Sequence, residues 1–302
     1  MYNESHCARR WNALMAPGTG DVKAELAQEA AEYFGSTVDQ ILARVATAGA
    51  RFKNEWQDRR PDPGNERALA EFYNSSESEL FELIGWHASD PIHYRTLMCL
   101  DVALGRPGRQ FLDFGSGIGS DAIAFANAGY TVTLADVSEP LLAFAKWRCE
   151  RRGCRVRTID LKRNELPPST YDAAVCFDVL EHIPKPIRTL GRISRSLTDG
   201  GLLFVHAPFG VDPDRPMHVV HADAITRRMR TVGFNWRGDL EADFPSWLWA
   251  PRVYERFELS ALDGLGYYLY DVVMPGSIGS RLAAAYRHLK PRRPASERAD
   301  VR

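Results

Sequence analysis

Residues 111–119 read Phe111-Leu112-Asp113-Phe114-Gly115-Ser116-Gly117-Ile118-Gly119, and this stretch decides the fold. An apolar run leads into an acid and then into glycine at every second position, and a helical pattern follows. Glycine has no Cβ, so the chain can turn sharply out of a strand and let a ligand approach the backbone closely. The stretch therefore predicts a strand, a turn that binds a nucleotide-type cofactor, and a helix.

The spacing of the glycines distinguishes between cofactors. A dinucleotide turn has the pattern G-x-G-x-x-G, which would require glycine or alanine where this chain has Ser120. Asp113 suits a ligand that carries a cationic ammonium, whereas it would repel a pyrophosphate. The pattern Asp113-x-Gly115-x-Gly117 resembles the first motif of class I S-adenosylmethionine-dependent methyltransferases. That resemblance implies S-adenosylmethionine as cofactor and S-adenosylhomocysteine as product, with an NAD-linked oxidoreductase as the disfavoured alternative.

Short apolar runs alternate with helical patterns from Arg109 onward, which is typical of a parallel, doubly wound sheet. We expect strands at 110–114, 130–135, 156–159, 173–177 and 202–206, and a late strand at 253–259. The fold class is then α/β: a Rossmann-like, mostly parallel sheet, to which the resemblance assigns seven strands. Open sheets of this kind bind ligands where their strands end. We therefore expect the residues that end the strands to lie together at one edge of the sheet: Asp113, Asp136, Asp160, Asp178 and His206.

Three segments are expected along the chain. Helical periodicity runs over residues 21–58, with a break near Gly35, and over residues 66–104, with a break near Asp90. Residues 1–105 are therefore predicted to form an all-helical cap that covers the substrate. Residues 106–260 should form the S-adenosylmethionine-binding methyltransferase domain, and residues 261–302 a helical extension with a basic tail.

The resemblance covers residues from about 109 to 235 and assigns further cofactor contacts. Asp136 ends the second strand about 20 residues after the glycines, where a carboxylate binds ribose hydroxyls. Asp160 and Leu161 are placed beside the adenine. The segment from Asp178 to Pro184 is similar to one in ubiquinone and menaquinone methyltransferases, where the sheet edge meets the methyl donor. The full set of predicted cofactor residues is Asp113, Gly115, Ser116, Gly117, Gly119, Asp136, Val137, Asp160, Leu161, Phe177, Asp178, Val179, His182, Tyr73 and Tyr94.

Methyl transfer to a hydroxyl, an acidic carbon or a protonated amine requires that a base remove a proton. Histidine suits this role near neutral pH. The candidates that follow the fourth and fifth strands are His206, His218, His182 and His221. A structural role for each of them remains open.

A divalent metal is an alternative use of the same region. Carboxylates and imidazoles bind Mg²⁺, Zn²⁺ or Fe²⁺, and the ubiquinone O-methyltransferases use a similar segment for a metal, although Asp178 stands where those enzymes have glutamate. The candidate ligands are Asp178, Glu181, His182, His218 and His221.

The composition of the chain limits the classes of partner that we expect it to bind. The net charge is −1, which provides no general attraction to nucleic acid, and no apolar run is long enough for a membrane span. The five cysteines form no C-x-x-C pair, and we expect a cytoplasmic protein. The aromatic segment Phe244 to Trp249 favours an apolar or aromatic acceptor, such as a natural-product or quinone-like intermediate of secondary metabolism. A homodimer, and a non-catalytic S-adenosylmethionine-binding protein, remain open alternatives.

Overall fold

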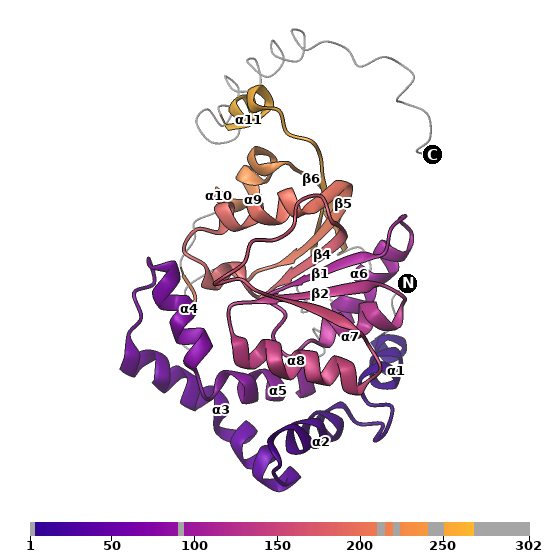
Figure 1. Cartoon of the computed structure of the whole chain (residues 1–302), viewed down its shortest axis with the longest axis vertical. Helices are drawn as coiled ribbons and strands as arrows, with labels where there is room; N and C mark the ends of the chain where they lie inside the picture. Colours follow the sequence, from indigo (N-terminus) through magenta and orange to yellow (C-terminus); the bar gives the residue numbers. More distant parts are fainter. Residues whose placement is uncertain (1–3, 90–93, 210–214, 220–223, 241–250, 269–302) are drawn as a thin grey trace.

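The computed structural model describes residues 4–89, 94–209, 215–219, 224–240 and 251–268. Figure 1 shows the arrangement of its helices and strands. In chain order the elements are α1 (Glu4–Met15), α2 (Val22–Phe34), α3 (Val38–Arg59), α4 (Glu66–Ser75), α5 (Glu79–Ser89), α6 (Tyr94–Leu104), β1 (Gln110–Phe114), α7 (Ser120–Asn127), β2 (Thr131–Asp136), α8 (Glu139–Arg151), β3 (Val156–Asp160), β4 (Tyr171–Phe177), η2 (Leu180–His182), α9 (Pro186–Ser196), β5 (Leu197–His206), α10 (Ala224–Arg228), η3 (Met229–Val232), β6 (Phe234–Asp239), β7 (Arg252–Arg256) and α11 (Ala261–Tyr268).

The strands form one seven-stranded sheet in the order β3-β2-β1-β4-β5-β7-β6. Strands β1 to β5 run parallel, and β7 is antiparallel to both β5 and β6. Helices α7 and α8 lie on one side of the sheet and α9 and α10 on the other (Figure 1). The predicted doubly wound, mostly parallel seven-stranded sheet is therefore confirmed.

The parallel register brings the strand ends to one edge. Asp136 of β2 lies opposite Asp160 of β3, and Phe177 of β4 lies opposite His206 of β5. The chain leaves β1 through Gly115 at φ +74°, a conformation that side chains with a Cβ rarely adopt. A Cβ at Gly115 would lie 2.2 Å from Val179 Cγ2, so the turn also needs glycine to pass the end of β4.

Helices of the N-terminal part pack on the α8 side of the sheet. Leu26 of α2 and Ile84 of α5 are buried in one cluster with Phe144 of α8. A smaller aromatic cluster joins α3 and α4 to Met217 through Phe52 and Phe72. The N-terminal helices therefore form one wall of any cavity at the sheet edge.

The structure differs from the expected elements in a few places. Strand β5 begins at Leu197 rather than at Leu202, and the helical stretch after Glu66 has a further break at residues 76–78, where Ser76 accepts the backbone N–H groups of Ser78 and Glu79. Helix α1 and strand β6 were not predicted, because neither polar segment shows a clear apolar period. Of the C-terminal extension, α11 is described and residues 269–302 lie outside the described residues. No helix in the described part of the chain is long and apolar enough to cross a membrane.

Candidate active site

Asp136 connects the glycine turn to the following helix. Its Oδ2 accepts the backbone N–H of Gly117 at 3.0 Å, and its Oδ1 accepts that of Ser138 at 2.9 Å. Burial raises the pKa of Asp136, although these backbone donors oppose the shift. Ser138 also begins α8, since its side chain accepts the N–H of Leu141. The carboxylate is thus fixed at the pocket wall, where ribose hydroxyls would need an acceptor.

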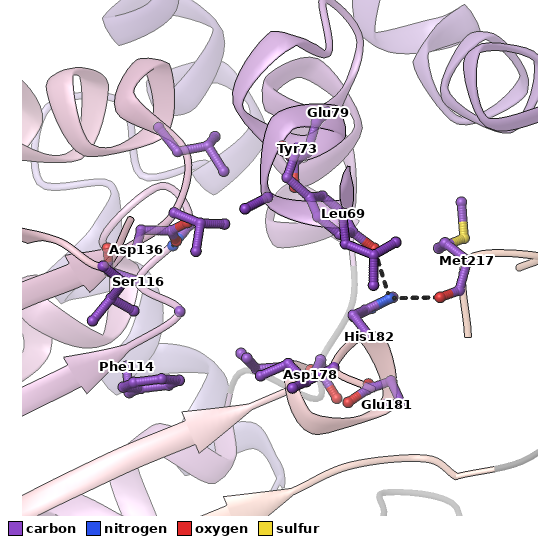
Figure 2. Close-up of a pocket in the computed structure, with 18 of the residues that line it drawn as sticks. Leu69, Tyr73, Glu79, Phe114, Ser116, Asp136, Asp178, Glu181, His182 and Met217 are labelled. Carbon is purple, nitrogen blue, oxygen red and sulfur yellow. Dashed lines mark hydrogen bonds between the residues drawn. The ribbon is translucent and has the colours of Figure 1, made fainter. Parts of the chain in front are cut away.

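The pocket at this edge has a volume of about 1080 Å³. Figure 2 shows residues from the strand ends on one side and Leu69, Tyr73 and Glu79 from the helices on the other. Ser116 Oγ is buried and has no hydrogen-bond partner in the described part of the chain, so the turn presents an available hydroxyl. The predicted site residues on the wall are Tyr73, Gly115, Ser116, Gly117, Asp136, Val137, Leu161, Phe177, Asp178, Val179, Glu181, His182 and His218.

Four predicted cofactor residues lie behind or beside this wall. Asp113 Oδ2 accepts the N–H of Ala122 at 3.1 Å, so its carboxylate holds the start of α7 instead of facing the cavity. Asp160 Oδ1 accepts the backbone N–H of Lys162 at 2.9 Å. Gly119 approaches α8, and Tyr94 packs against the core. Direct contact of these residues with a cofactor remains a prediction.

The described histidines have different surroundings. His182 Nδ1 lies 3.0 Å from the Tyr73 hydroxyl, and its ring lies 4.9 Å from that of His218. Burial and the neighbouring His218 lower the pKa of His182 to about 4, so its ring is neutral near pH 7. His206 was expected beside the substrate space, but its ring is buried and absent from the pocket wall. His221 lies outside the described residues.

Arg95 is a site residue that the sequence interpretation missed. Its guanidinium pairs with the Asp178 carboxylate, and its Nη1 lies 2.8 Å from His206 Nδ1. Asp178 Oδ1 lies 2.5 Å from the same ring nitrogen, which explains why His206 faces this cluster. Burial would raise the pKa of Asp178, but Arg95 and His206 outweigh it and hold the pKa well below its ordinary value. The available signal was a charged residue within the apolar pattern of α6.

Arg95 also lines the pocket. Its guanidinium lies 4.4 Å from the centre of the Phe177 ring, and its Nε has no hydrogen-bond partner in the described residues. A buried cation with an unused donor suits an anionic group of a ligand.

Buried acidic residues also line the rest of the pocket wall. Among them, only Glu181 was predicted from the sequence. Burial, together with the charge of Asp178, raises the pKa of Glu181 well above its ordinary value. Burial and the charge of Asp136 do the same for Glu79, while burial raises the pKa of Glu82 against the opposing charge of Arg215. These carboxyls favour a ligand that brings positive charge or hydrogen-bond donors.

Glu181, His182 and His218 could hold a cation. Their ligand atoms all lie within 4.8 Å of one another, and both Glu181 oxygens lack a hydrogen-bond partner among the described residues. One carboxylate and two imidazoles match the donor preferences of Zn²⁺ or Fe²⁺. Asp178, an expected member of this set, is engaged by Arg95 and His206 and does not belong to the group.

Comparisons with known proteins agree with this geometry. A family model described as a methyltransferase domain matches residues 92–252. A ubiquinone biosynthesis O-methyltransferase of Xanthomonas campestris pv. campestris (strain B100) is 25% identical over 198 residues, which cover 61% of this chain and 82% of that protein. An uncharacterized protein of Synechococcus sp. is 34% identical over 113 residues, and the match covers 35% of this chain and 27% of that longer protein.

Two solved structures share the fold. The 1,6-didemethyltoxoflavin-N1-methyltransferase of Burkholderia thailandensis superposes with a TM-score of 0.50 at 20% identity and covers 63% of this chain and 88% of its own. An S-adenosylmethionine-dependent methyltransferase of Leishmania major gives a TM-score of 0.50 at 19% identity, with coverage of 68% and 90%.

The sheet order, the glycine turn and the acid that ends β2 define a Rossmann-like protein that binds a nucleoside-containing cofactor. The chain belongs to the methyltransferase domain family and is a class I S-adenosylmethionine-dependent methyltransferase. Its cofactor is S-adenosylmethionine, with S-adenosylhomocysteine as the product, and NAD is not supported.

Proposed function

We propose that this protein transfers a methyl group from S-adenosylmethionine to a small aromatic acceptor. The observation that carries the proposal is the size and composition of the pocket. Its volume of about 1080 Å³ is slightly above the roughly 300–1,000 Å³ typical of single-ligand pockets. One end carries the cofactor turn, and the other extends between Phe52, Leu69 and Trp86 of the helices. This leaves room for a second molecule beside the cofactor.

The proposed cofactor contacts follow from the positions of the charges. Asp136 accepts the ribose hydroxyls, and Leu161 packs beside the adenine. Arg95 binds the carboxylate of the methionine part, because it is a buried cation on this wall with an unused donor. The surrounding acids, Glu79 among them, favour the ammonium and sulfonium charges.

The acceptor is proposed to be a phenol-like or quinone-like compound that is methylated on oxygen. The aromatic and aliphatic side chains of the helical wall support a flat apolar acceptor, as does the similarity to ubiquinone biosynthesis O-methyltransferases. When bound, S-adenosylmethionine supplies a methyl group activated by the sulfonium charge. His218 accepts the acceptor's proton while the oxygen takes the methyl group and S-adenosylhomocysteine is released. His182, with its low pKa, orients the acceptor instead.

Incubation with S-adenosylmethionine and a panel of phenols, catechols and hydroquinones tests this proposal, with methylated products identified by mass spectrometry. We expect at least one phenolic oxygen to gain a methyl group, and Asp136→Ala to abolish that product. Products methylated only on nitrogen or carbon would contradict the acceptor class. Calorimetric binding of S-adenosylhomocysteine without any turnover across wider panels would favour the non-catalytic alternative.

A metal-assisted reaction is the second candidate, because Glu181 presents two buried oxygens without a partner in the described residues. With its Nδ1 proton donated to the Met217 carbonyl, 3.4 Å away, His182 would present Nε2 to the metal. Glu181, His182 and His218 would then hold a cation that lowers the pKa of the acceptor hydroxyl. Elemental analysis of the purified protein and turnover after chelation test this candidate. No bound metal and unchanged turnover would exclude it.

A further inference from the structure

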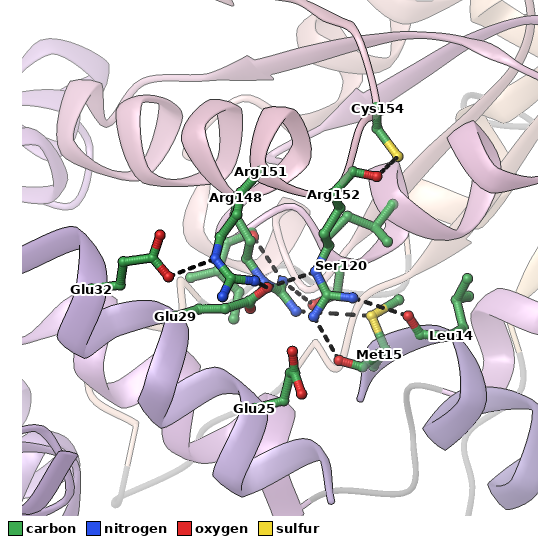
Figure 3. A network of polar contacts seen from close by, with 12 residues as sticks. Leu14, Met15, Glu25, Glu29, Glu32, Ser120, Arg148, Arg151, Arg152 and Cys154 are labelled. Atoms are coloured by element: carbon green, nitrogen blue, oxygen red, sulfur yellow. Dashed lines mark hydrogen bonds and ion pairs between the residues drawn. The ribbon is translucent and has the colours of Figure 1, made fainter. Parts of the chain in front are cut away.

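A buried ion pair joins the N-terminal helices to the cofactor turn. Arg148 of α8 donates from Nε to Glu29 Oε2 of α2 at 2.6 Å, and both side chains are 0% exposed. The same guanidinium donates from Nη1 to the Ile118 carbonyl at 3.0 Å and to the Ser120 hydroxyl at 2.9 Å. Figure 3 shows this network. We propose that Glu29 is a positioning residue for the methyl donor, acting through Arg148 on the glycine turn.

The contacts of Arg148 lie directly beside the cofactor wall. Gly117 donates its N–H to Asp136, and the next residue, Ile118, gives its carbonyl to Arg148. The turn is therefore held on one side by the acid that binds ribose and on the other by a guanidinium. A shift of Arg148 changes the position of the turn without removing any group that contacts the donor.

The second oxygen of Glu29 fixes the pair in place. Arg152 donates from Nε to Glu29 Oε1 at 2.6 Å and from its Nη atoms to the Leu14 and Met15 carbonyls at the end of α1. Burial would raise the pKa of Glu29, but the two guanidiniums outweigh it and lower the pKa. Glu29 therefore stays ionised at neutral pH. It holds Arg148 from α2, and Arg152 ties the same carboxylate to the end of α1.

The network also reaches the other wall of the pocket. His87 of α5 lines the cavity, and its Nδ1 lies 3.0 Å from Ser120 Oγ. Because this oxygen already accepts from Arg148, its hydroxyl proton is available to His87, whose Nδ1 then accepts. Glu29 and His87 both lie outside residues 92–252, the part matched by the family model. The N-terminal helices thus support a turn that belongs to the family domain.

The neighbouring pair Arg151–Glu32 provides a matched control. Its Nε–Oε2 distance is 2.8 Å and it joins the same two helices, but it is partly exposed. Arg151 also lies 3.8 Å from Glu29 Oε1, yet neither Arg151 nor Glu32 contacts the turn among the described residues. Glu29→Gln and Glu32→Gln therefore each remove one carboxylate charge from the α2–α8 interface. Only the first change releases Arg148.

Calorimetric titration of S-adenosylhomocysteine into the full-length variants, with thermal unfolding measured in parallel, tests the proposal. Glu29→Gln should weaken binding about tenfold or more, whereas Glu32→Gln should stay within about twofold of the wild type. Loss of one partner of a buried pair can prevent folding, so Ser120→Ala is the second variant. It keeps the ion pair, removes the hydroxyl between Arg148 and His87, and should weaken binding about fivefold with little change in melting temperature.

Binding that is unchanged in both Glu29→Gln and Ser120→Ala would overturn the proposal. Equal weakening in Glu29→Gln and Glu32→Gln would also overturn it, because affinity would then follow general stability. If Glu29→Gln does not fold, Ser120→Ala decides the question alone. None of these outcomes depends on the acceptor, so a failure of the proposed function remains distinguishable.

Discussion

The two walls of the pocket are built in different ways. The donor wall consists of strand ends and a glycine turn joined by hydrogen bonds, such as that from the Gly117 N–H to the Asp136 carboxylate. The acceptor wall consists of side chains from α3, α4 and α5 together with residues 215–218. The family model matches the first wall but not these helices. We infer that substitutions on the donor wall change cofactor affinity, and that those on the acceptor wall change turnover and acceptor affinity.

Asp136→Ala should have the largest effect. The carboxylate can accept two ribose hydroxyls, and hydrogen bonds to charged groups contribute about 1.5–3 kcal/mol each, so affinity for S-adenosylhomocysteine should fall about 100-fold or more. The substitution also leaves the N–H groups of Gly117 and Ser138 without their acceptor. Calorimetric titration measures the change. A loss below about fivefold would show that Asp136 holds the turn without contacting the ribose.

The substitution His218→Ala tests the role of the acceptor wall. A general base contributes about 10²- to 10⁴-fold, so turnover should fall about 100-fold or more at saturating acceptor. Because His218 belongs to the acceptor wall, affinity for S-adenosylhomocysteine should stay within about twofold of the wild type. A comparable loss of cofactor affinity would show that the two walls are not separable. His206→Asn provides a comparison, since that ring lies behind Asp178 and off the pocket wall.

The donor wall could be predicted because its signals are local in sequence. A buried strand, a glycine turn and an acid at the next strand end are spaced by the fold itself, and Asp136 and Ser116 both line the pocket. Strand ends do not determine side-chain direction. His206 does end β5, but its ring faces Arg95 and Asp178. The backbone of Asp178 adopts a φ of +55°.

Other parts of the pocket depend on contacts between residues far apart in sequence. Arg95 meets Asp178 across 83 positions, and Tyr73 meets His182 across 109. No periodicity within α4 or α6 identifies these partners, because they are determined by how the helices pack on the sheet. The predicted aromatic segment Phe244 to Trp249 lies outside the described residues, so its place in the acceptor site remains a prediction.

Gly115→Ala should have an intermediate effect on the donor wall. Both φ at this position, +74°, and the 2.2 Å approach of an added Cβ to Val179 oppose the substitution. Overpacking of this kind costs about 1–3 kcal/mol, so cofactor affinity should fall about 10-fold or more as the turn moves. Gly153→Ala is the matched control, with the same φ but no atom within 4 Å of the added Cβ. It should lower the melting temperature slightly and leave affinity unchanged, and an equal loss in both variants would mean that only backbone strain matters.

Tyr73→Phe should have the smallest effect and decides to which wall this residue belongs. The sequence places Tyr73 with the cofactor, whereas its hydroxyl lies 3.0 Å from His182 Nδ1. Burial and the charge of Glu79 raise the pKa of Tyr73 well above its ordinary value, so the hydroxyl stays protonated. Loss of one such bond, worth about 0.5–1.5 kcal/mol, should lower turnover about threefold to tenfold and leave S-adenosylhomocysteine affinity within about twofold. If affinity falls and turnover at saturating cofactor does not, Tyr73 contacts the donor, and α4 contributes to the donor wall as well as to the acceptor wall.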